Sequence, residues 1–217
     1  MQRVAVTGAN RGIGLEIVAR LRKRGDDVVA ICRQASTELE DCGAQVISGV
    51  DVSDAAAVAA LAGRLGAAPL DMLVNNAGAL SAEDFESADW ADSIRRQFEV
   101  NALGPLRVTR ALLPLLAPGA KIGIVSSRVG SLTDNSSGGY YGYRMSKAAV
   151  NMAGVNLAHE LKVRQIAVFL LHPGYVRTEM TSGGGGKDAP TAARELVALM
   201  DRLTLAETGS LVCTSYS

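Results

Sequence analysis

The sequence predicts a single α/β domain in which a mostly parallel, seven-stranded sheet is covered by helices on both faces. The length of 217 residues fits one compact domain. The chain is 48% hydrophobic but only 4% aromatic, so small aliphatic side chains must fill the core, as they do in buried parallel sheets. Strand-like and helix-like segments alternate, and strands separated by helices join through right-handed crossovers into a parallel sheet.

Short, apolar and often β-branched runs mark the expected strands. These cover residues 4–7, 28–31, 45–50, 72–74, 121–126, 166–171 and 210–214. Apolar residues at helical spacing mark the expected helices. These cover residues 12–24, 37–41, 54–65, 90–116, 143–161 and 191–203. Ser53 is the expected N-cap of the third helix, and Pro105 predicts a kink in the fourth.

Charge, cysteine usage and hydropathy exclude several classes of protein. The 22 basic and 22 acidic residues balance, and no basic stripe marks a nucleic-acid partner. No apolar run approaches the roughly 18 residues of a membrane span, and no signal-peptide pattern opens the chain. The widely spaced Cys32, Cys42 and Cys213 fit neither a disulfide framework nor a zinc site. We therefore expect a cytoplasmic protein with no metal and no nucleic-acid or membrane partner.

The first expected strand runs into a glycine-rich turn that precedes the first helix. Gly8, Gly12 and Gly14 follow Thr7 in the pattern TGxxxGxG. Glycines let the backbone turn sharply and approach a phosphate closely, and the N-terminus of the next helix attracts an anion. Because this turn lies between a strand and a helix, it predicts a pyrophosphate site in a doubly wound Rossmann fold.

Further motifs follow in a fixed order along the chain. They are Asn75-Asn76-Ala77-Gly78 after the fourth strand, the YxxxK pair of Tyr143 and Lys147, and Pro173-Gly174 before Thr178. With the glycine turn, they resemble the short-chain dehydrogenase/reductase family over nearly the whole chain. Within that family, the segments Ser126-Ser127-Arg128-Val129-Gly130 and Gly138-Gly139-Tyr140-Tyr141-Gly142-Tyr143 most closely resemble the C-factor-like and sniffer-like carbonyl reductases. The resemblance implies one NADP-binding Rossmann domain over residues 1–217, with a catalytic helix at 143–161 and a flexible substrate loop at 175–190.

Two arginines bear on the choice of cofactor. Arg33 ends the second strand, where an acidic residue would bind the adenosine ribose and repel a 2′-phosphate. Its guanidinium and that of Arg11 favour NADP(H), although both side chains are also compatible with a solvated surface. By resemblance, Asp51 and Val52 bind the adenine. The expected cofactor-binding residues are Gly8, Asn10, Arg11, Gly12, Ile13, Gly14, Arg33, Asp51, Val52, Asn75, Ala77, Gly78, Tyr143, Lys147, Pro173, Gly174, Val176 and Thr178.

Tyr143 and Lys147 stand four residues apart in a helix, so they share one face. A phenol has an ordinary pKa of about 10, and a neighbouring ammonium, together with the positive nicotinamide of an oxidised cofactor, favours the phenolate. We therefore expect an acidified Tyr143 that exchanges a proton with a carbonyl or alcohol oxygen. By resemblance, Lys147 also binds the nicotinamide ribose and Ser127 orients the substrate oxygen, with Ser126 and Ser131 as alternatives.

The resemblance also implies that the amide of Asn101 holds a water between Lys147 and solvent. The implied activity is NADPH-dependent reduction of a small aldehyde or ketone, or the reverse oxidation. Helices 90–116 and 143–161 are expected to form the face of a homodimer. The alternative is an NAD(P)-binding signalling protein of the C-factor type with little turnover, but such a protein does not require a serine, a tyrosine and a lysine together.

Overall fold

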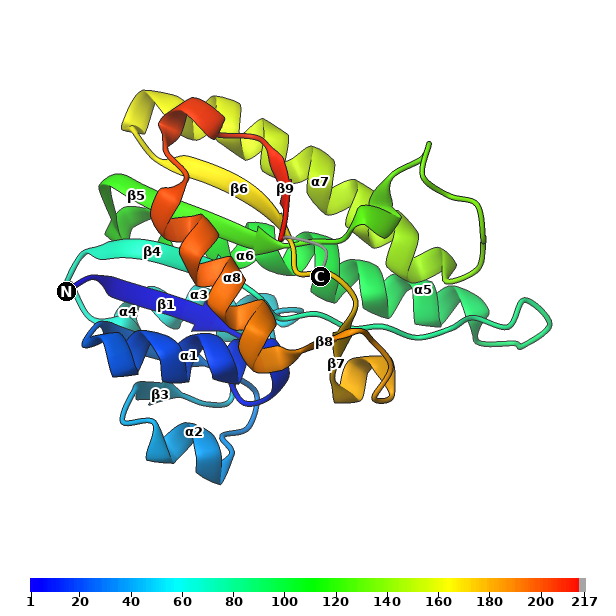
Figure 1. The fold of residues 1–217 in the computed structure, drawn as a ribbon, viewed down its shortest axis with the longest axis horizontal. Coiled ribbons are helices and arrows are strands. Elements are labelled where there is room, and N and C mark those ends of the chain that lie inside the picture. Colours follow the sequence, from blue (N-terminus) through cyan, green and yellow to red (C-terminus); the bar gives the residue numbers. More distant parts are fainter. Residues whose placement is uncertain (215–217) are drawn as a thin grey trace.

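The computed structural model describes residues 1–214 as a three-layer α/β domain (Figure 1). Seven strands form one sheet in the order β3-β2-β1-β4-β5-β6-β9, and all neighbouring pairs run parallel. They are β1 Arg3–Thr7, β2 Asp27–Ile31, β3 Gln45–Ile47, β4 Leu70–Asn75, β5 Leu116–Val125, β6 Ala167–His172 and β9 Leu211–Cys213. The predicted doubly wound, seven-stranded sheet is confirmed. Residues 215–217 of the expected domain lie outside the described residues.

Helices cover both faces of this sheet. They are α1 Gly12–Arg24, α2 Thr37–Asp41, α3 Ala55–Ala59, α4 Leu61–Leu65, α5 Trp90–Phe98, α6 Gly104–Leu112, α7 Tyr141–Leu161 and α8 Ala189–Arg202. In Figure 1, α1 and α8 cross the sheet on the viewer's side, and α6 lies behind it. None of the helices in residues 1–214 is long and apolar enough to cross a membrane.

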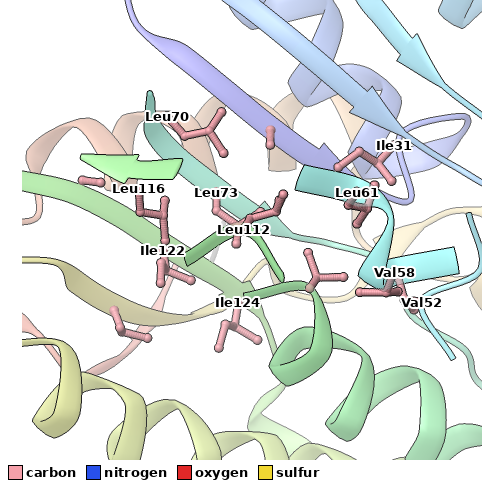
Figure 2. Close-up of a cluster of buried hydrophobic side chains, with 14 of the residues drawn as sticks. Ile31, Val52, Val58, Leu61, Leu70, Leu73, Leu112, Leu116, Ile122 and Ile124 are labelled. Carbon is pink, nitrogen blue, oxygen red and sulfur yellow. The ribbon is translucent and has the colours of Figure 1, made fainter. Parts of the chain in front are cut away.

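The two faces bury different side chains, because successive residues of a strand point to opposite sides of a sheet. Phe169 of β6 packs in the cluster that contains residues of α1 and α8. The preceding residue, Val168, packs in the cluster that contains residues of α6 and α7. Figure 2 shows part of this second cluster, in which Ile122 and Ile124 of β5 lie close to Leu112 of α6. These two cores fix the strands, and so fix where their carboxyl ends lie.

The helix expected over residues 90–116 is interrupted. A π-helical turn, Glu99–Leu103, separates α5 from α6, and Leu116 already begins β5. Pro105 lies in the first turn of α6 and has no N–H for the carbonyl four residues earlier. The regular hydrogen-bond pattern therefore fails just before the proline, and the irregularity predicted there takes the form of a π turn. Such turns are frequent at functional sites.

The expected N-cap of the third helix is wrong by one residue. Asp54, not Ser53, accepts the N–H groups of Ala56 and Ala57, at 2.8 and 3.2 Å. The segment predicted as one helix also forms two, because α3 ends at Ala59 and α4 begins at Leu61. Ser53 instead donates to a neighbouring carboxylate that lies in the site described below.

The segment expected as a flexible loop, residues 175–190, contains short regular elements. Strand β7, Val176–Arg177, pairs in parallel with β8, Lys187–Asp188, and α8 begins at Ala189. A 3-10 turn over Glu179–Thr181 lies between the two strands. In Figure 1 this segment lies at the right-hand ends of the central strands, which places it over the edge where the site forms.

Candidate active site

A large pocket opens at the carboxyl ends of the central strands. Its volume is about 910 Å³, within the roughly 300–1,000 Å³ of small-molecule sites. Residues that follow β1, β2, β4, β5 and β6 form most of its wall, and it is completed by Tyr175, Val176 and residues 178–182. In a doubly wound sheet, ligands bind in such a crevice outside the carboxyl ends of the strands.

The glycine turn forms one end of the pocket. Gly8 has a φ of +64°, and a Cβ on it would lie 2.8 Å from the Cα of Ala77. A Cβ on Gly14 would lie 2.2 Å from the carbonyl oxygen of Gly8, so Gly14 allows α1 to pack beneath the turn. Only glycine permits these two close approaches. The turn residues that line the pocket are Gly8, Asn10, Arg11, Gly12 and Ile13.

The N-terminus of α1 is open to an anion at this end. Arg11 is the N-cap residue, with extended backbone, and within residues 1–214 its side chain makes no capping hydrogen bond. The first N–H groups of a helix have no partner inside the helix, and the helix dipole adds partial positive charge there. The turn and the helix together therefore provide a cradle for a pyrophosphate.

The segment after β4 fastens the glycine turn. Thr7 Oγ1 accepts the backbone N–H of Asn76 at 3.0 Å and that of Ala77 at 3.1 Å. The amide of Asn76 donates in return to the carbonyls of Thr7 and Gly8, each at 3.1 Å. Four hydrogen bonds thus lock the two segments together and hold the cradle in one shape.

The two asparagines of this motif have different surroundings. Ala77 and Gly78 line the pocket as predicted, but Asn75 does not. Its amide donates at 3.2 Å to Thr109 Oγ1 of α6, inside the domain. Asn76, which the predicted set omits, lines the pocket instead. The physical reason is that adjacent residues at a strand end face opposite sides.

Each arginine expected to bind a 2′-phosphate lines the pocket and has a carboxylate partner. Arg33 lies 3.8 Å from Asp51, and Arg11 pairs with Glu179. Burial opposes ionisation of Asp51, but hydrogen bonds from Ser53 and the charge of Arg33 hold its pKa below the ordinary value. Exposed ion pairs contribute about 1 kcal/mol or less, so both guanidinium groups remain available to a more highly charged phosphate.

The YxxxK pair forms the other end of the pocket. Helix α7 places Lys147 Nζ 5.5 Å from the centre of the Tyr143 ring. The ammonium donates to the carbonyl of Val125 at 2.9 Å, at the end of β5. A hydrogen bond joins the phenol to Ser127, which also lines the pocket. A hydroxyl, a phenol and an amine therefore line the same end of the pocket.

The alternative serines have other partners. Ser126 donates to Asn151 of α7 at 2.5 Å. Ser131 lies 3.2 Å from Thr133 Oγ1 and accepts the backbone N–H of Asp134. Of these three serines, Ser127 is the one hydrogen-bonded to the phenol of Tyr143.

Burial controls the protonation of the pair. Burial raises the pKa of Tyr143 to about 12, although the hydrogen bond with Ser127 opposes the rise. Burial also lowers the pKa of Lys147 to about 8. The predicted acidification of Tyr143 is therefore wrong for the chain by itself, because burial disfavours the phenolate. At neutral pH the site holds a protonated phenol beside an amine that titrates near physiological pH.

Asn101 lies in the π turn, buried beside the site. Its amide donates to the carbonyl of Ala79 at 2.8 Å and to Ser146 Oγ at 3.0 Å, and its oxygen accepts the N–H of Ala79 at 2.8 Å. Both amide hydrogens thus have partners within the protein, while the amide oxygen keeps a second lone pair, so the water-binding role of Asn101 stays a prediction. Because Ser146 Oγ donates to the carbonyl of Tyr143 at 2.8 Å, Asn101 also connects the pocket wall to α7.

The remaining predicted cofactor residues all line the pocket. They are Val52, Pro173, Gly174, Val176 and Thr178. The sequence reasoning missed Cys32, Arg144 and His172, which line it too. Cys32 and His172 stand at strand ends, a position that signals a site in this fold. Burial and the nearby charges of Arg128 and Lys187 lower the pKa of His172.

Comparison with known proteins agrees with this geometry. Residues 2–186 match the family model described as short chain dehydrogenase. The chain is 46% identical over 210 residues to 1-hydroxy-2-glutathionyl-2-methyl-3-butene dehydrogenase of Rhodococcus sp. (strain AD45), covering 94% of this chain and 92% of that protein. It is 43% identical over 147 residues to C-signal of Myxococcus xanthus, covering 65% of this chain and 86% of that protein.

A solved structure gives the same result. The NADPH-bound carbonyl reductase from chicken fatty liver matches with a TM-score of 0.84 and 27% identity, over 98% of this chain and 96% of that one. The family model spans both the glycine turn and the YxxxK pair, so the match includes both ends of the pocket. This chain belongs to the short-chain dehydrogenase family of oxidoreductases.

Proposed function

We propose that this protein is an NADPH-dependent oxidoreductase that reduces an aldehyde or ketone to an alcohol, or catalyses the reverse oxidation. The observation that carries the proposal is that Ser127, Tyr143 and Lys147 share one pocket with the glycine turn. A nicotinamide dinucleotide supplies or accepts the hydride when it is bound. The NADPH-bound carbonyl reductase with the same fold supports this choice of cofactor.

The residues present fit such a dinucleotide. Neither Gly8 nor Gly14 has room for a Cβ. A turn that brings its backbone close to a phosphate requires glycine at such positions. The pocket of about 910 Å³ extends from this cradle to Tyr143, so it is long enough to join a phosphate site to a catalytic end. Asp51 and Val52 would contact the adenine, and Lys147 the nicotinamide ribose.

The chain's own groups perform the proton transfer. Ser127 orients the carbonyl oxygen beside the phenol of Tyr143. The phenol is protonated at neutral pH because its pKa is raised to about 12, so it can act as the general acid. Lys147 then stabilises the phenolate by its charge and returns a proton to it, since its own pKa of about 8 allows exchange near physiological pH.

A panel of aldehydes and ketones tests the proposal. We expect oxidation of NADPH, followed by absorbance, with at least part of the panel and faster than with NADH. The contradicting result is tight NADPH binding without turnover of any carbonyl or, in the reverse direction, any alcohol. That result would favour the signalling alternative, for which the 43% identity to C-signal is the supporting observation.

Replacing Arg33 by Asp should weaken the binding of NADPH much more than that of NADH. We expect the Kd for NADPH to rise about tenfold or more, because charge-assisted hydrogen bonds contribute roughly 1.5–3 kcal/mol, and the Kd for NADH to change little. Fluorescence titration of both cofactors measures this. Arg164→Asp, on the exposed turn after α7, is the control with the same change in charge. Unchanged discrimination in Arg33→Asp would exclude Arg33 as the phosphate ligand.

A homodimer through α5 and α7 is also proposed. Trp90 of α5 is 38% exposed, and Met145 and Met152 of α7 are 52% and 64% exposed. Phe85 lies between Trp90 and Tyr141, with ring centres 5.1 and 4.4 Å away, and extends this apolar surface. Light scattering after gel filtration measures the mass, and a monomer at micromolar concentration would contradict the proposal.

A further inference from the structure

The catalytic end of the pocket carries a positive charge that the mechanism does not use. Arg144 follows Tyr143 on α7 and lines the pocket. Its Nε donates to the carbonyl of Gly139 at 3.1 Å, its Nη1 to the carbonyl of Val129 at 3.4 Å, and its Nη2 to Ser137 Oγ at 2.8 Å. All three acceptors are neutral, so these bonds fix the guanidinium without balancing its charge.

The other arginines of the pocket have acidic partners. The pairs are Arg11 with Glu179, Arg33 with Asp51, and Arg128 with Asp134. Within residues 1–214, no carboxylate lies at ion-pair distance from Arg144. The acidic residues that line the pocket are Asp51 and Glu179, and each is already paired. The charge of Arg144 is therefore open to a ligand.

The held guanidinium also keeps donors for that ligand. An arginine has five N–H donors, and three of those of Arg144 are occupied. The remaining two belong to a planar group whose position is already fixed, so little conformational freedom is lost when an anion binds. Guanidinium and carboxylate groups match in geometry, and their hydrogen bonds are among the strongest in proteins.

The position of Arg144 connects it with the reacting group. Val129, one of its acceptors, stands two residues after Ser127, and Ser137 and Tyr140 line the same end of the pocket. We infer that Arg144 forms a subsite for a carboxylate of the substrate, so that the protein acts on carbonyl or alcohol compounds that carry an acid group. This inference rests on the proposed function, because it assigns the substrate class of the same site.

A pair of aldehydes that differ in one charge tests the inference. The probes are 4-carboxybenzaldehyde and its uncharged methyl ester, methyl 4-formylbenzoate. Calorimetry measures the binding of each aldehyde to the protein saturated with NADP⁺. The oxidised cofactor has no hydride to transfer, so the aldehyde is not reduced during the measurement. Turnover of each is then measured with NADPH. We expect the acid to bind about tenfold or more tightly than the ester, with a matching advantage in KM.

Variants separate the charge of Arg144 from its structural role. Arg144→Met should abolish the preference for the acid and change binding of the ester little, whereas Arg144→Lys should keep part of the preference. Ser137→Ala removes one bond that fixes the guanidinium but keeps the charge, so the preference should persist. Arg164→Met, which removes an exposed arginine beyond the far end of α7, controls for net charge and should keep the full preference.

The outcomes distinguish the inference from the proposed function. Equal binding of acid and ester by the unaltered protein, or no binding of the acid, overturns the carboxylate subsite even if both aldehydes are reduced. If Arg144→Met weakens the binding of the acid and of the ester equally, the inference is also overturned. That result is expected of a residue that only supports the structure of the loop. An acid preference that depends on Arg144, without turnover of either aldehyde, supports the subsite and contradicts the reductase.

Discussion

Replacing Tyr143 by Phe is expected to lower kcat by about 10²–10⁴-fold, the usual contribution of a positioned general acid. The substitution removes the oxygen that donates the proton and keeps the ring. The phenol is half-buried and hydrogen-bonded to Ser127, and its pKa of about 12 keeps the proton on it at neutral pH. Without it, the carbonyl oxygen must take its proton from water. The measurement is the rate of NADPH oxidation at a saturating concentration of a carbonyl that the unaltered protein reduces.

Binding and a matched control complete this test. The affinity for NADPH should change less than tenfold in Tyr143→Phe, because the glycine turn and the arginines are untouched. Tyr141→Phe is the control, since Tyr141 lies on the same helix but is 44% exposed and packs edge-on against Phe85. It should leave kcat within about twofold. Equal rates for Tyr143→Phe and the unaltered protein would remove Tyr143 from the mechanism.

The sequence predicted the fold because several independent signals agreed. Apolar strands and amphipathic helices alternate, and the glycine turn falls where the first strand meets the first helix. The structure adds the reason that so little aromatic content suffices. The central strands distribute small residues between two cores, as Val28 and Val29 of β2 do. Position at the carboxyl end of a strand was therefore a reliable guide to Arg33, Ser127 and Gly174, all of which line the pocket.

The errors lie where three-dimensional context decides. The motif Asn75-Asn76 does not reveal which side chain faces the pocket, because that depends on the orientation of the strand end. The spacing of Tyr143 and Lys147 puts them on one face but does not tell how deeply the helix is buried. Burial reversed the expected shift of the phenol pKa. The contacts that fix Arg144 could not be predicted from the sequence either. Two of the three acceptors are backbone carbonyls, which the identity of a residue does not reveal.

Replacing Lys147 by Met should stabilise the protein and inactivate it at once. Burial lowers the pKa of Lys147 from 10.5 to about 8, which at about 1.36 kcal/mol per pKa unit penalises the folded state by roughly 3 kcal/mol at pH 7. Methionine has no charge to bury, but it leaves the carbonyl of Val125 without its donor, at a cost of about 1–2 kcal/mol. The nucleotide-free variant should therefore gain about 1–2 kcal/mol at pH 7, while turnover falls at least about 10²-fold.

The stability difference between Lys147→Met and the unaltered protein should depend on pH. Between pH 8 and 10.5 the unfolded chain binds more protons at Lys147 than the folded chain does, so the unaltered protein gains stability as pH rises through that window. The advantage of Lys147→Met should shrink over the same window, as urea unfolding at several pH values would measure. Lys162→Met, at an exposed lysine after α7, should stay within about 0.5 kcal/mol of the unaltered protein. If Lys147→Met is less stable than the unaltered protein at pH 7, the hydrogen bond to Val125 outweighs the cost of burying the charge. In that case the ammonium stabilises the folded state in addition to its role in proton transfer.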